Sequence, residues 1–349
     1  MNKFRTSLFF DMRAPSFGAP AREIYAAALE MTEFADRIGM TKVGFMEHHG
    51  CDDGYLANPF LMGAAAAART KHIRINLGAV VLPLHDPLKV AEDIAILDQI
   101  SQGRLEVIFG AGYVPSEFAR FGVSLHDRAR LMDRGIETIL RALSGEARDS
   151  EGREILVRPL PIQNPKDILL VGGAVKASAI RAARFDLGFA PVNPRLFPLY
   201  EAEMRARGQV PRSMHGPGRP LCIHLVEDVE AGWTELLPHA MHVAASYAAW
   251  SDETGMHKSP FHGLGTEEAM RAAGIFQVWT PDQMLEYAAG LPPHATLGFM
   301  PLLGGLAPEV GWRCLRLLEQ AMPRLAALQS RDRSGAQESS PGQSAPNQV

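Results

Sequence analysis

Short apolar runs alternate along this chain with amphipathic or alanine-rich stretches. Apolar runs with few polar interruptions predict strands of a parallel sheet that is covered on both faces. Eight such runs lie at 4–11, 42–47, 73–81, 105–110, 168–171, 187–191, 221–226 and 295–300. Helical patterns lie at 20–38, 58–69, 87–101, 126–143, 174–184, 195–207, 228–250, 281–290 and 308–328. Eight strand–helix units predict an α/β fold, a (β/α)₈ TIM barrel with insertions at its C-terminal face, with an open doubly wound sheet as the alternative.

Three segments interrupt the alternation. Residues 144–166 are rich in charge and proline, and they predict a hairpin outside the barrel. Residues 251–280 contain four glycines among aromatic residues and histidines, which favours a folded lid. The chain from Ser330 onward has almost no apolar residues. It predicts a disordered tail at 330–349 after one folded domain at 1–329.

The composition is that of an ordinary globular protein: 349 residues, 46% hydrophobic and 21% charged, with a net charge of −4. This charge does not favour binding to nucleic acid or to an anionic membrane. No apolar run is long enough to span a bilayer, and the N-terminus does not have the pattern of a signal peptide. Cys51, Cys222 and Cys314 are widely spaced and match no metal or redox motif. We therefore expect reduced thiols and a cytoplasmic protein.

The sharpest local motif is Glu47-His48-His49-Gly50, where the second predicted strand ends. Side chains at the C-terminal ends of barrel strands converge on the ligand, and a histidine there can exchange a proton near neutral pH. His48 is the candidate catalytic residue, although a histidine that bonds to a loop carbonyl would fit equally well. Adjacent residues of an extended strand point to opposite faces, so His48 and His49 should not share a metal ion. We expect no metal site.

A second motif, Gly172-Gly173-Ala174 followed by Lys176, closes the fifth predicted strand and opens a helix. Glycines let backbone amides approach a ligand, and a helix N-terminus favours an anion such as phosphate. Gly172, Gly173, Ala174 and Lys176 are therefore candidate cofactor-binding residues. A purely steric turn would have the same pattern.

A third motif, Phe109 to Tyr113, ends the fourth predicted strand and includes Ala111. Its small residues would let a planar ring lie against the backbone, with Tyr113 as a wall. An ordinary turn is the alternative. Further along the chain, His239 and His242 share one face of a predicted helix. No third metal ligand is evident there, so we expect a polar helix face.

These segments, taken in order, resemble the luciferase-like flavin-dependent monooxygenases. The resemblance is carried by EHHG at 47–50, ANPF at 57–60, AAAARTKHIRINLGAVVLP at 65–83, HDPLKVAEDIAILDQISQGRLE at 85–106 and FGAGYVPSEFARFGV at 109–123. Weaker similarity at 172–183 and 281–283 extends it over most of the chain.

The resemblance implies a barrel, a homodimer, and reduced FMN that a separate flavin reductase supplies. His48 would be the catalytic histidine beside the flavin. Gly78 and Ala79 would lie at a strand end that often has a non-prolyl cis peptide against the flavin ring. Gly172 and Gly173 would help to hold the flavin phosphate.

One position departs from this pattern. Ala111 stands where many relatives have an arginine that contacts the phosphate. The charge would then be met by Lys176, by Arg128 or Arg130, or by backbone amides alone. The type of flavin therefore stays open.

The function expected from the resemblance is oxygenation of a small organic substrate by reduced FMN and O₂, with His48 handling a proton. A deazaflavin (coenzyme F-420)-dependent oxidoreductase on the same barrel is the first alternative. Ala111 favours this alternative and the EHH motif disfavours it. A non-catalytic flavin-binding partner subunit is the second alternative, which the presence of His48 disfavours.

Overall fold

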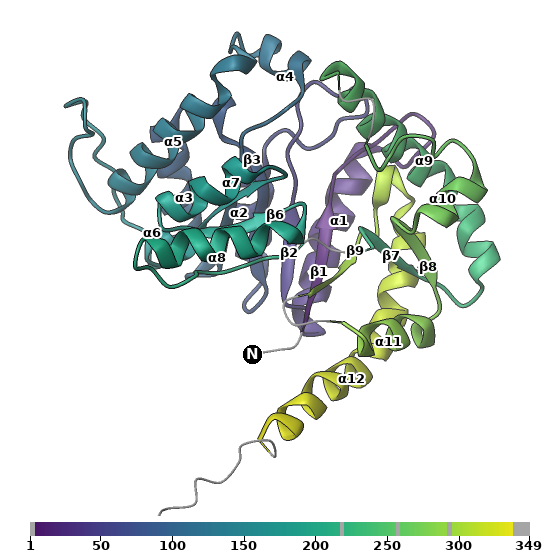
Figure 1. Ribbon diagram of the computed structural model, residues 1–349. Helices are drawn as coiled ribbons and strands as arrows, with labels where there is room; N and C mark the ends of the chain where they lie inside the picture. Colours follow the sequence, from purple (N-terminus) through teal and green to yellow (C-terminus); the bar gives the residue numbers. More distant parts are fainter. Residues whose placement is uncertain (1–3, 217–219, 256–258, 292–294, 338–349) are drawn as a thin grey trace, which may run out of the picture.

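The computed structural model describes residues 4–216, 220–255, 259–291 and 295–337, with side chains up to residue 328 (Figure 1). Its strands are β1 (Phe4–Phe10), β2 (Lys42–Phe45), β3 (Arg74–Val81), β4 (Leu105–Gly110), β5 (Leu169–Gly173), β6 (Gly188–Pro191), β7 (Cys222–Leu225), β8 (Phe276–Trp279) and β9 (Ala295–Phe299). Its α-helices are α1 (Ala21–Arg37), α2 (Pro59–Arg69), α3 (Pro87–Ser101), α4 (Pro115–Arg120), α5 (Arg128–Leu143), α6 (Pro165–Ile168), α7 (Lys176–Arg184), α8 (Phe197–Ala206), α9 (Val229–Glu253), α10 (Glu267–Ala273), α11 (Pro281–Ala289) and α12 (Pro308–Gln337).

The strands form one parallel sheet in the order β6-β5-β4-β3-β2-β1-β9-β7-β8. Consecutive strands are neighbours from β1 to β6, and β1 also pairs with β9. A doubly wound sheet would instead reverse its strand order near the middle. The predicted α/β class is therefore confirmed, and the strand order favours the barrel over the doubly wound alternative. Among the residues described, no ladder joins β6 to β8.

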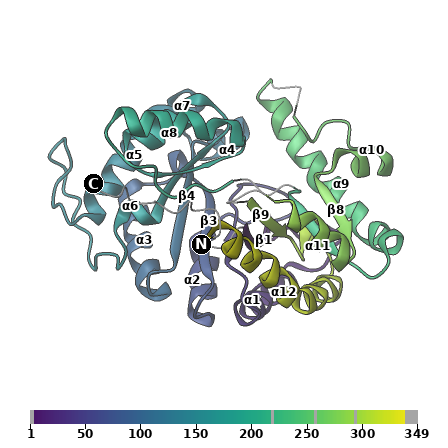
Figure 2. The same cartoon turned by 60° about the horizontal axis from the view of Figure 1, so that its bottom comes forward.

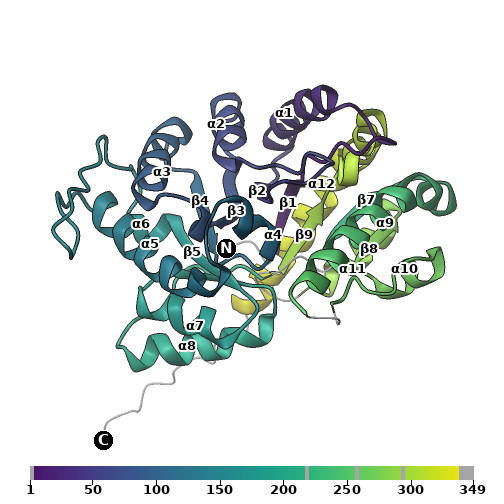
Figure 3. The same ribbon diagram turned by 90° about the horizontal axis from the view of Figure 1, so that it is seen from above.

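Most of the helices lie around the strands, and α4 lies over the middle of the molecule when it is seen from above (Figure 3). Local capping signals fix where several helices begin. The Asp86 side chain accepts from the amides of Leu88 and Lys89 at the start of α3. Thr280 and Gln283 form a reciprocal capping box at the start of α11. Because these caps sit just beyond strand ends, they also fix where the loops at the C-terminal face end.

The segment at 251–280 differs from the lid that its sequence suggested. It contains α10 and the strand β8, which pairs with β7. Phe276 and Val278 of β8 are buried and pack with α9. The prediction of a loop at 276–279 was wrong. This strand has only four residues and follows a glycine-rich stretch, so its pattern in the sequence is too short to be recognised.

The sequence also predicted a hairpin at 144–166 and a disordered tail from residue 330. Residues 144–166 contain an antiparallel bridge between Arg148 and Glu154, so the predicted hairpin is confirmed. The helix α12 continues to Gln337, past the boundary predicted at Ser330, and the disordered tail stays a prediction. Residues 338–349 lie outside the described part of the chain. None of the described helices is both long enough and apolar enough to cross a membrane.

Charged residues gather at the N-terminal ends of β1 to β4, the end that Figure 2 brings forward. Nε of Arg74 donates to Oε1 of Glu106 over 2.9 Å, and Nε2 of His215 lies 3.6 Å from the same oxygen. Burial lowers the pKa of Lys42 to about 8, although Glu106 opposes this shift. Arg5 also interacts with Glu106. Glu106 is therefore the carboxylate that these basic groups share.

Replacing Glu106 with Gln should lower the free energy of unfolding by about 3–5 kcal/mol, because it leaves the buried ammonium of Lys42 without its carboxylate. Urea denaturation followed by circular dichroism measures this change. Glu33→Gln is the control: it removes an exposed carboxylate paired with Arg69 and should cost less than about 1 kcal/mol. Equal urea midpoints for Glu106→Gln and the native protein would contradict this role.

Candidate active site

His48 lies just past the end of β2, and its ring is oriented by a buried carboxylate. Its amide donates to the carbonyl of Leu56 over 3.1 Å, which folds the following loop back. Nδ1 of His48 lies 2.8 Å from Oε1 of Glu117, and the amide of His49 donates to the same oxygen over 2.9 Å. Glu117 belongs to α4 and is 2% exposed. The end of β2 is thus tied to the segment that follows β4.

This contact determines what His48 can do chemically. A carboxylate acceptor favours the proton on Nδ1, which leaves Nε2 available to accept or deliver a proton. In the part of the chain that the structure describes, Nε2 of His48 has no hydrogen-bond partner. The imidazole can therefore exchange a proton at Nε2.

Aromatic rings surround this imidazole. Trp250 stacks on it with a centroid distance of 4.1 Å and an interplanar angle of 20°. Tyr55, Tyr247 and Tyr113 meet it edge-on at 4.8, 5.9 and 6.1 Å. Burial raises the pKa of all three phenols, so they stay neutral. The surroundings of His48 are therefore largely aromatic, with three neutral hydroxyl groups.

These rings come from three parts of the fold: the loops after β2 and β4, and the C-terminal half of α9. Phe261, from the segment predicted as a lid, stacks on Tyr247 at 4.9 Å and adds a further ring. Tyr113 was the wall residue predicted from the sequence. Tyr55, Tyr247 and Trp250 were missed, because nothing in their local sequence shows that their rings converge.

A second carboxylate, Glu47, binds the other histidine of the motif. Oε1 of Glu47 lies 2.7 Å from Nε2 of His49 and 2.7 Å from Nε2 of His85. The amide of Val81 donates to Oε2 over 3.2 Å. Burial would raise the pKa of Glu47, but these histidines hold it below its ordinary value.

The ligand atoms of Glu47, His49 and His85 lie within 4.8 Å of one another, a spacing that a metal ion could bridge. Hydrogen bonds among the three already use these atoms, and we assign the group a structural role. His48 turns to Glu117 and His49 turns to Glu47. The two adjacent rings therefore contact different carboxylates, as expected for neighbouring residues that point to opposite faces.

The strand ends predicted to hold a flavin lie next to one another. The peptide bond between Gly78 and Ala79 is cis, as the resemblance led us to expect. A Cβ atom on Gly110 would lie 3.1 Å from Cβ of Ala79, and one on Gly172 would lie 2.9 Å from Cγ2 of Ile108. Ala111 follows at the end of β4. Small residues thus bring the ends of β3, β4 and β5 close together.

The helix start predicted to hold phosphate is formed by α7, which begins at Lys176 after Ala174. Lys176 and Ala174 are exposed. Gly173 has a φ of +146°, and a Cβ atom there would lie 2.7 Å from Cβ of Ser178. A substitution of Gly173 would therefore strain the backbone before it affected any ligand.

The two histidines on α9 bind different partners. Nδ1 of His239 lies 2.8 Å from the carbonyl oxygen of Gly304, and Nε2 of His242 lies 2.7 Å from Oδ2 of Asp53. Both therefore belong to a polar helix face, as the sequence indicated.

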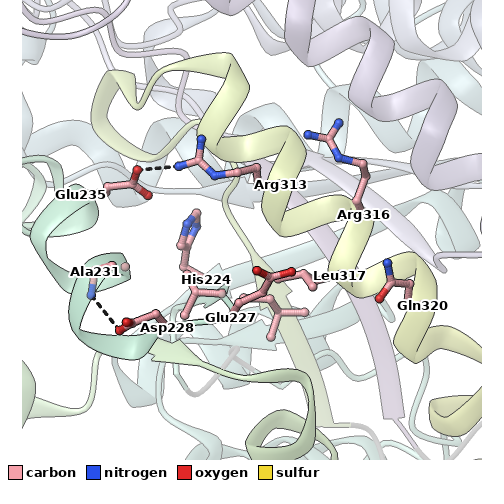
Figure 4. Close-up of a pocket in the computed structure, with 12 residues that line it drawn as sticks. His224, Glu227, Asp228, Ala231, Glu235, Arg313, Arg316, Leu317 and Gln320 are labelled. Carbon is pink, nitrogen blue, oxygen red and sulfur yellow. Dashed lines mark hydrogen bonds and ion pairs between the residues drawn. The ribbon is translucent and has the colours of Figure 1, made fainter.

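A separate pocket lies between the start of α9 and α12 (Figure 4). His224 of β7 lines it together with Glu235, Arg313 and Arg316. Burial lowers the pKa of His224 to about 4, so its imidazole is neutral near pH 7. None of the aromatic residues around His48 lines this pocket, so it is distinct from the site at His48.

A family model described as luciferase-like monooxygenase matches residues 5–295. The chain therefore belongs to the luciferase-like monooxygenase family. Limonene 1,2-monooxygenase of Rhodococcus erythropolis is 36% identical over 118 residues, which are 34% of this chain and 30% of that protein. The oxygenase component of flavin-dependent trigonelline monooxygenase from Acinetobacter baylyi is 37% identical over 116 residues, 33% of this chain and 32% of that protein. Each match spans about a third of the relative.

Solved structures are similar over most of the chain. Monooxygenase RslO1 from Streptomyces bottropensis is 27% identical, with a TM-score of 0.69 over 91% of this chain and 98% of that one. The oxygenating constituent of 3,6-diketocamphane monooxygenase from Pseudomonas putida, bound to FMN, has a TM-score of 0.69 at 18% identity over 92% and 98%. A coenzyme F-420-dependent secondary alcohol dehydrogenase has a TM-score of 0.66 at 15% identity over 89% and 98%. These last two share the fold.

The hydrogen bond from His85 to Glu47 predicts how the pKa of His85 responds to the loss of that carboxylate. Burial would lower the pKa of His85, but the hydrogen bond to Glu47 raises it above 6.5. The contribution of protonated His85 to folding is therefore complete below pH 6.5 and is lost as the pH rises through the raised pKa. In Glu47→Gln, the effect of burial is opposed only by the charge of Asp93, and the pKa of His85 should fall.

An NMR titration of the histidine ring signals measures this shift. Glu33→Gln, which removes an exposed carboxylate on α1, is the control and should leave His85 unchanged. An identical His85 titration in Glu47→Gln and the native protein would show that the hydrogen bond does not control its charge.

Proposed function

We propose that this protein is a flavin-dependent monooxygenase that uses reduced FMN and O₂ to oxygenate a small organic substrate. The observation that carries the proposal is the arrangement of His48. Its Nδ1 is held by the buried carboxylate of Glu117, and its Nε2 is left for a ligand among aromatic rings. Family membership and the small residues at the ends of β3, β4 and β5 support the same function.

The residues present fit a flavin. The cis peptide at Gly78–Ala79, together with Ala111 and Tyr113, would lie along the flavin ring. The amides from Gly172 to Lys176 would meet the phosphate, because the N-terminus of α7 favours an anion. When bound, reduced FMN supplies the electrons that activate O₂.

The chain's own residues have three tasks in this chemistry. Nε2 of His48 accepts or delivers a proton at the reacting oxygen. Glu117 positions the imidazole through Nδ1. Tyr55, Tyr247 and Trp250 exclude water and contact the substrate body.

The choice of FMN is part of the proposal. A solved structure with the same fold, a 3,6-diketocamphane monooxygenase constituent, contains FMN. A deazaflavin-dependent oxidoreductase is the second candidate, because Ala111 provides no cation for a phosphate and one structural neighbour depends on coenzyme F-420. The buried Glu117–His48 pair disfavours a non-catalytic partner subunit, because burying a carboxylate to orient a histidine has a cost in folding free energy.

We further propose a separate flavin reductase as partner, since the trigonelline relative is named as an oxygenase component. A cytoplasmic location is consistent with three free cysteines. We also propose a homodimer, with α3 as part of its interface. Ile96 and Ile100 of α3 are exposed. Exposed Leu160 lies next to them, because its carbonyl accepts a hydrogen bond from the side chain of Gln99 over 2.8 Å. An exposed apolar patch of this kind is typical of an interface, and sedimentation velocity would measure the assembly state.

Replacing His48 with Ala should keep the fold and reduce turnover by ~10²-fold or more, the scale of lost acid–base help. Oxygen consumption with reduced FMN, across ketones, aldehydes and aromatic compounds, measures this effect. His72→Ala, an exposed histidine outside the site, is the control and should keep full activity. Full turnover in His48→Ala, with a native circular-dichroism spectrum, would refute the assignment.

Two variants test how the phosphate is bound. Ala111→Arg should tighten the binding of reduced FMN if the only effect of the alanine is that the phosphate lacks a positively charged partner. Lys176→Ala should weaken binding modestly and in a salt-dependent way, since Lys176 is exposed. Anaerobic titration of both variants with reduced FMN and with a deazaflavin measures these effects. Loss of FMN binding in Ala111→Arg, with deazaflavin bound by the native protein, would favour the second candidate.

A further inference from the structure

A buried arginine next to the His48 site has donors without a hydrogen-bond partner in the part of the chain that the structure describes. Arg13 follows β1 and is 1% exposed. Its Nη1 donates to the carboxylate of Asp53 and to Oγ of Ser246, the latter over 3.0 Å. Nε lies 3.7 Å from Oδ2 of Asp11, which is an ion pair but too long for a hydrogen bond. Nη2 has no hydrogen-bond partner among the residues described.

The guanidinium faces the same rings that surround His48. Its central carbon lies 4.6 Å from the ring centroid of Tyr55, 5.3 Å from that of Trp250 and 5.9 Å from that of Tyr247. Each of these three rings also contacts the imidazole of His48. Arg13 and His48 therefore contact the same cluster of aromatic rings.

Unused donors at this depth are unusual. Buried polar groups are almost always hydrogen-bonded, because a buried donor without an acceptor is costly. Aromatic faces attract the charge of a guanidinium but do not accept its hydrogen bonds as an oxygen atom does. The two N–H groups of Nη2 therefore lack an acceptor that a ligand could provide.

The charges around Arg13 select the kind of acceptor. The carboxylates of Asp11 and Asp53 both lie against the guanidinium, and Asp53 also contacts Nε2 of His242. A ligand carboxylate would add a third negative charge in a buried place, which is unfavourable. A neutral oxygen acceptor adds no charge and satisfies the same donors.

We propose that Nη2 of Arg13 binds the carbonyl oxygen of a neutral, otherwise apolar substrate such as a ketone. The body of that substrate packs on Tyr55, Tyr247 and Trp250. This inference rests on the proposed function, because it names the substrate class of the same site. Arg13 is then the residue that selects carbonyl compounds and orients them toward His48.

Trp250 provides a way to observe this binding. Its indole stacks on His48 and faces the guanidinium of Arg13, so a ligand that reaches Arg13 displaces or covers the indole. Intrinsic tryptophan fluorescence should therefore change on binding, and Trp250→Phe identifies the part of the signal that comes from this residue.

The experiment compares ketones with analogues in which =CH₂ replaces the carbonyl oxygen. Cyclohexanone is paired with methylenecyclohexane, 2-decanone with 2-methyl-1-decene, and acetophenone with α-methylstyrene. Cyclohexanecarboxylate is the anionic probe. Each is titrated into the flavin-free protein, and again with reduced FMN in the absence of O₂. We expect at least one ketone to bind 10-fold or more tightly than its analogue, and more tightly than the carboxylate.

Two variants assign this preference to Arg13. Arg13→Lys keeps the positive charge but lacks the second arm of the guanidinium fork, so the preference should fall to within about 2-fold. Ser246→Ala removes a different partner of Arg13 and leaves Nη2 free, so the preference should persist. Circular dichroism checks both folds. If Arg13→Lys does not fold, the comparison of each ketone with its analogue in the native protein still tests the proposal.

Equal binding of every ketone and its analogue, tighter binding of the carboxylate, or an unchanged preference in Arg13→Lys would each overturn the proposal. Oxygen consumption with reduced FMN could persist in those cases, and the proposed function would then stand without the carbonyl site. A ketone preference in a protein that does not bind FMN would count against the proposed function alone.

Discussion

The carboxylate of Glu117 is buried, and a buried carboxylate is stable only where donors surround it. Its donors are Nδ1 of His48 and the amide of His49, both just past the end of β2. Because Glu117 follows β4, this contact fixes the loops of two strands at once. The direction of His48, its contact with Trp250, and the separate direction of His49 toward Glu47 all depend on it.

The N-terminal and C-terminal ends of the strands differ in the kinds of side chain they hold. At the N-terminal ends, Lys42 and its basic neighbours share the carboxylate of Glu106, an arrangement that affects stability. At the C-terminal ends, small residues lie beside the Glu117–His48 pair, and Nη2 of Arg13 and Nε2 of His48 have no hydrogen-bond partner among the described residues. This division agrees with the general rule for parallel barrels, in which function lies at the C-terminal face.

The strand order and the position of His48 could be predicted from the sequence, because apolar runs and strand-ending motifs are local patterns. The strand β8 could not, since four residues between a glycine and a capped helix give too short a signal. Glu117 stood in a motif of the family resemblance, but its burial depends on contacts with a segment almost 70 residues away. The unused donors of Arg13 are likewise invisible without its neighbours Asp53 and Ser246.

We propose that His48, among these rings, serves oxygen transfer from O₂ to an organic compound. The most direct test of this proposal is to incubate the protein with reduced FMN, ¹⁸O₂ and the ketone panel, and to measure the mass of the products. We expect one atom of ¹⁸O in a product that forms only with the native protein and is reduced ~10²-fold in His48→Ala. Consumption of O₂ at the same rate with and without protein, with no labelled product, would contradict the account.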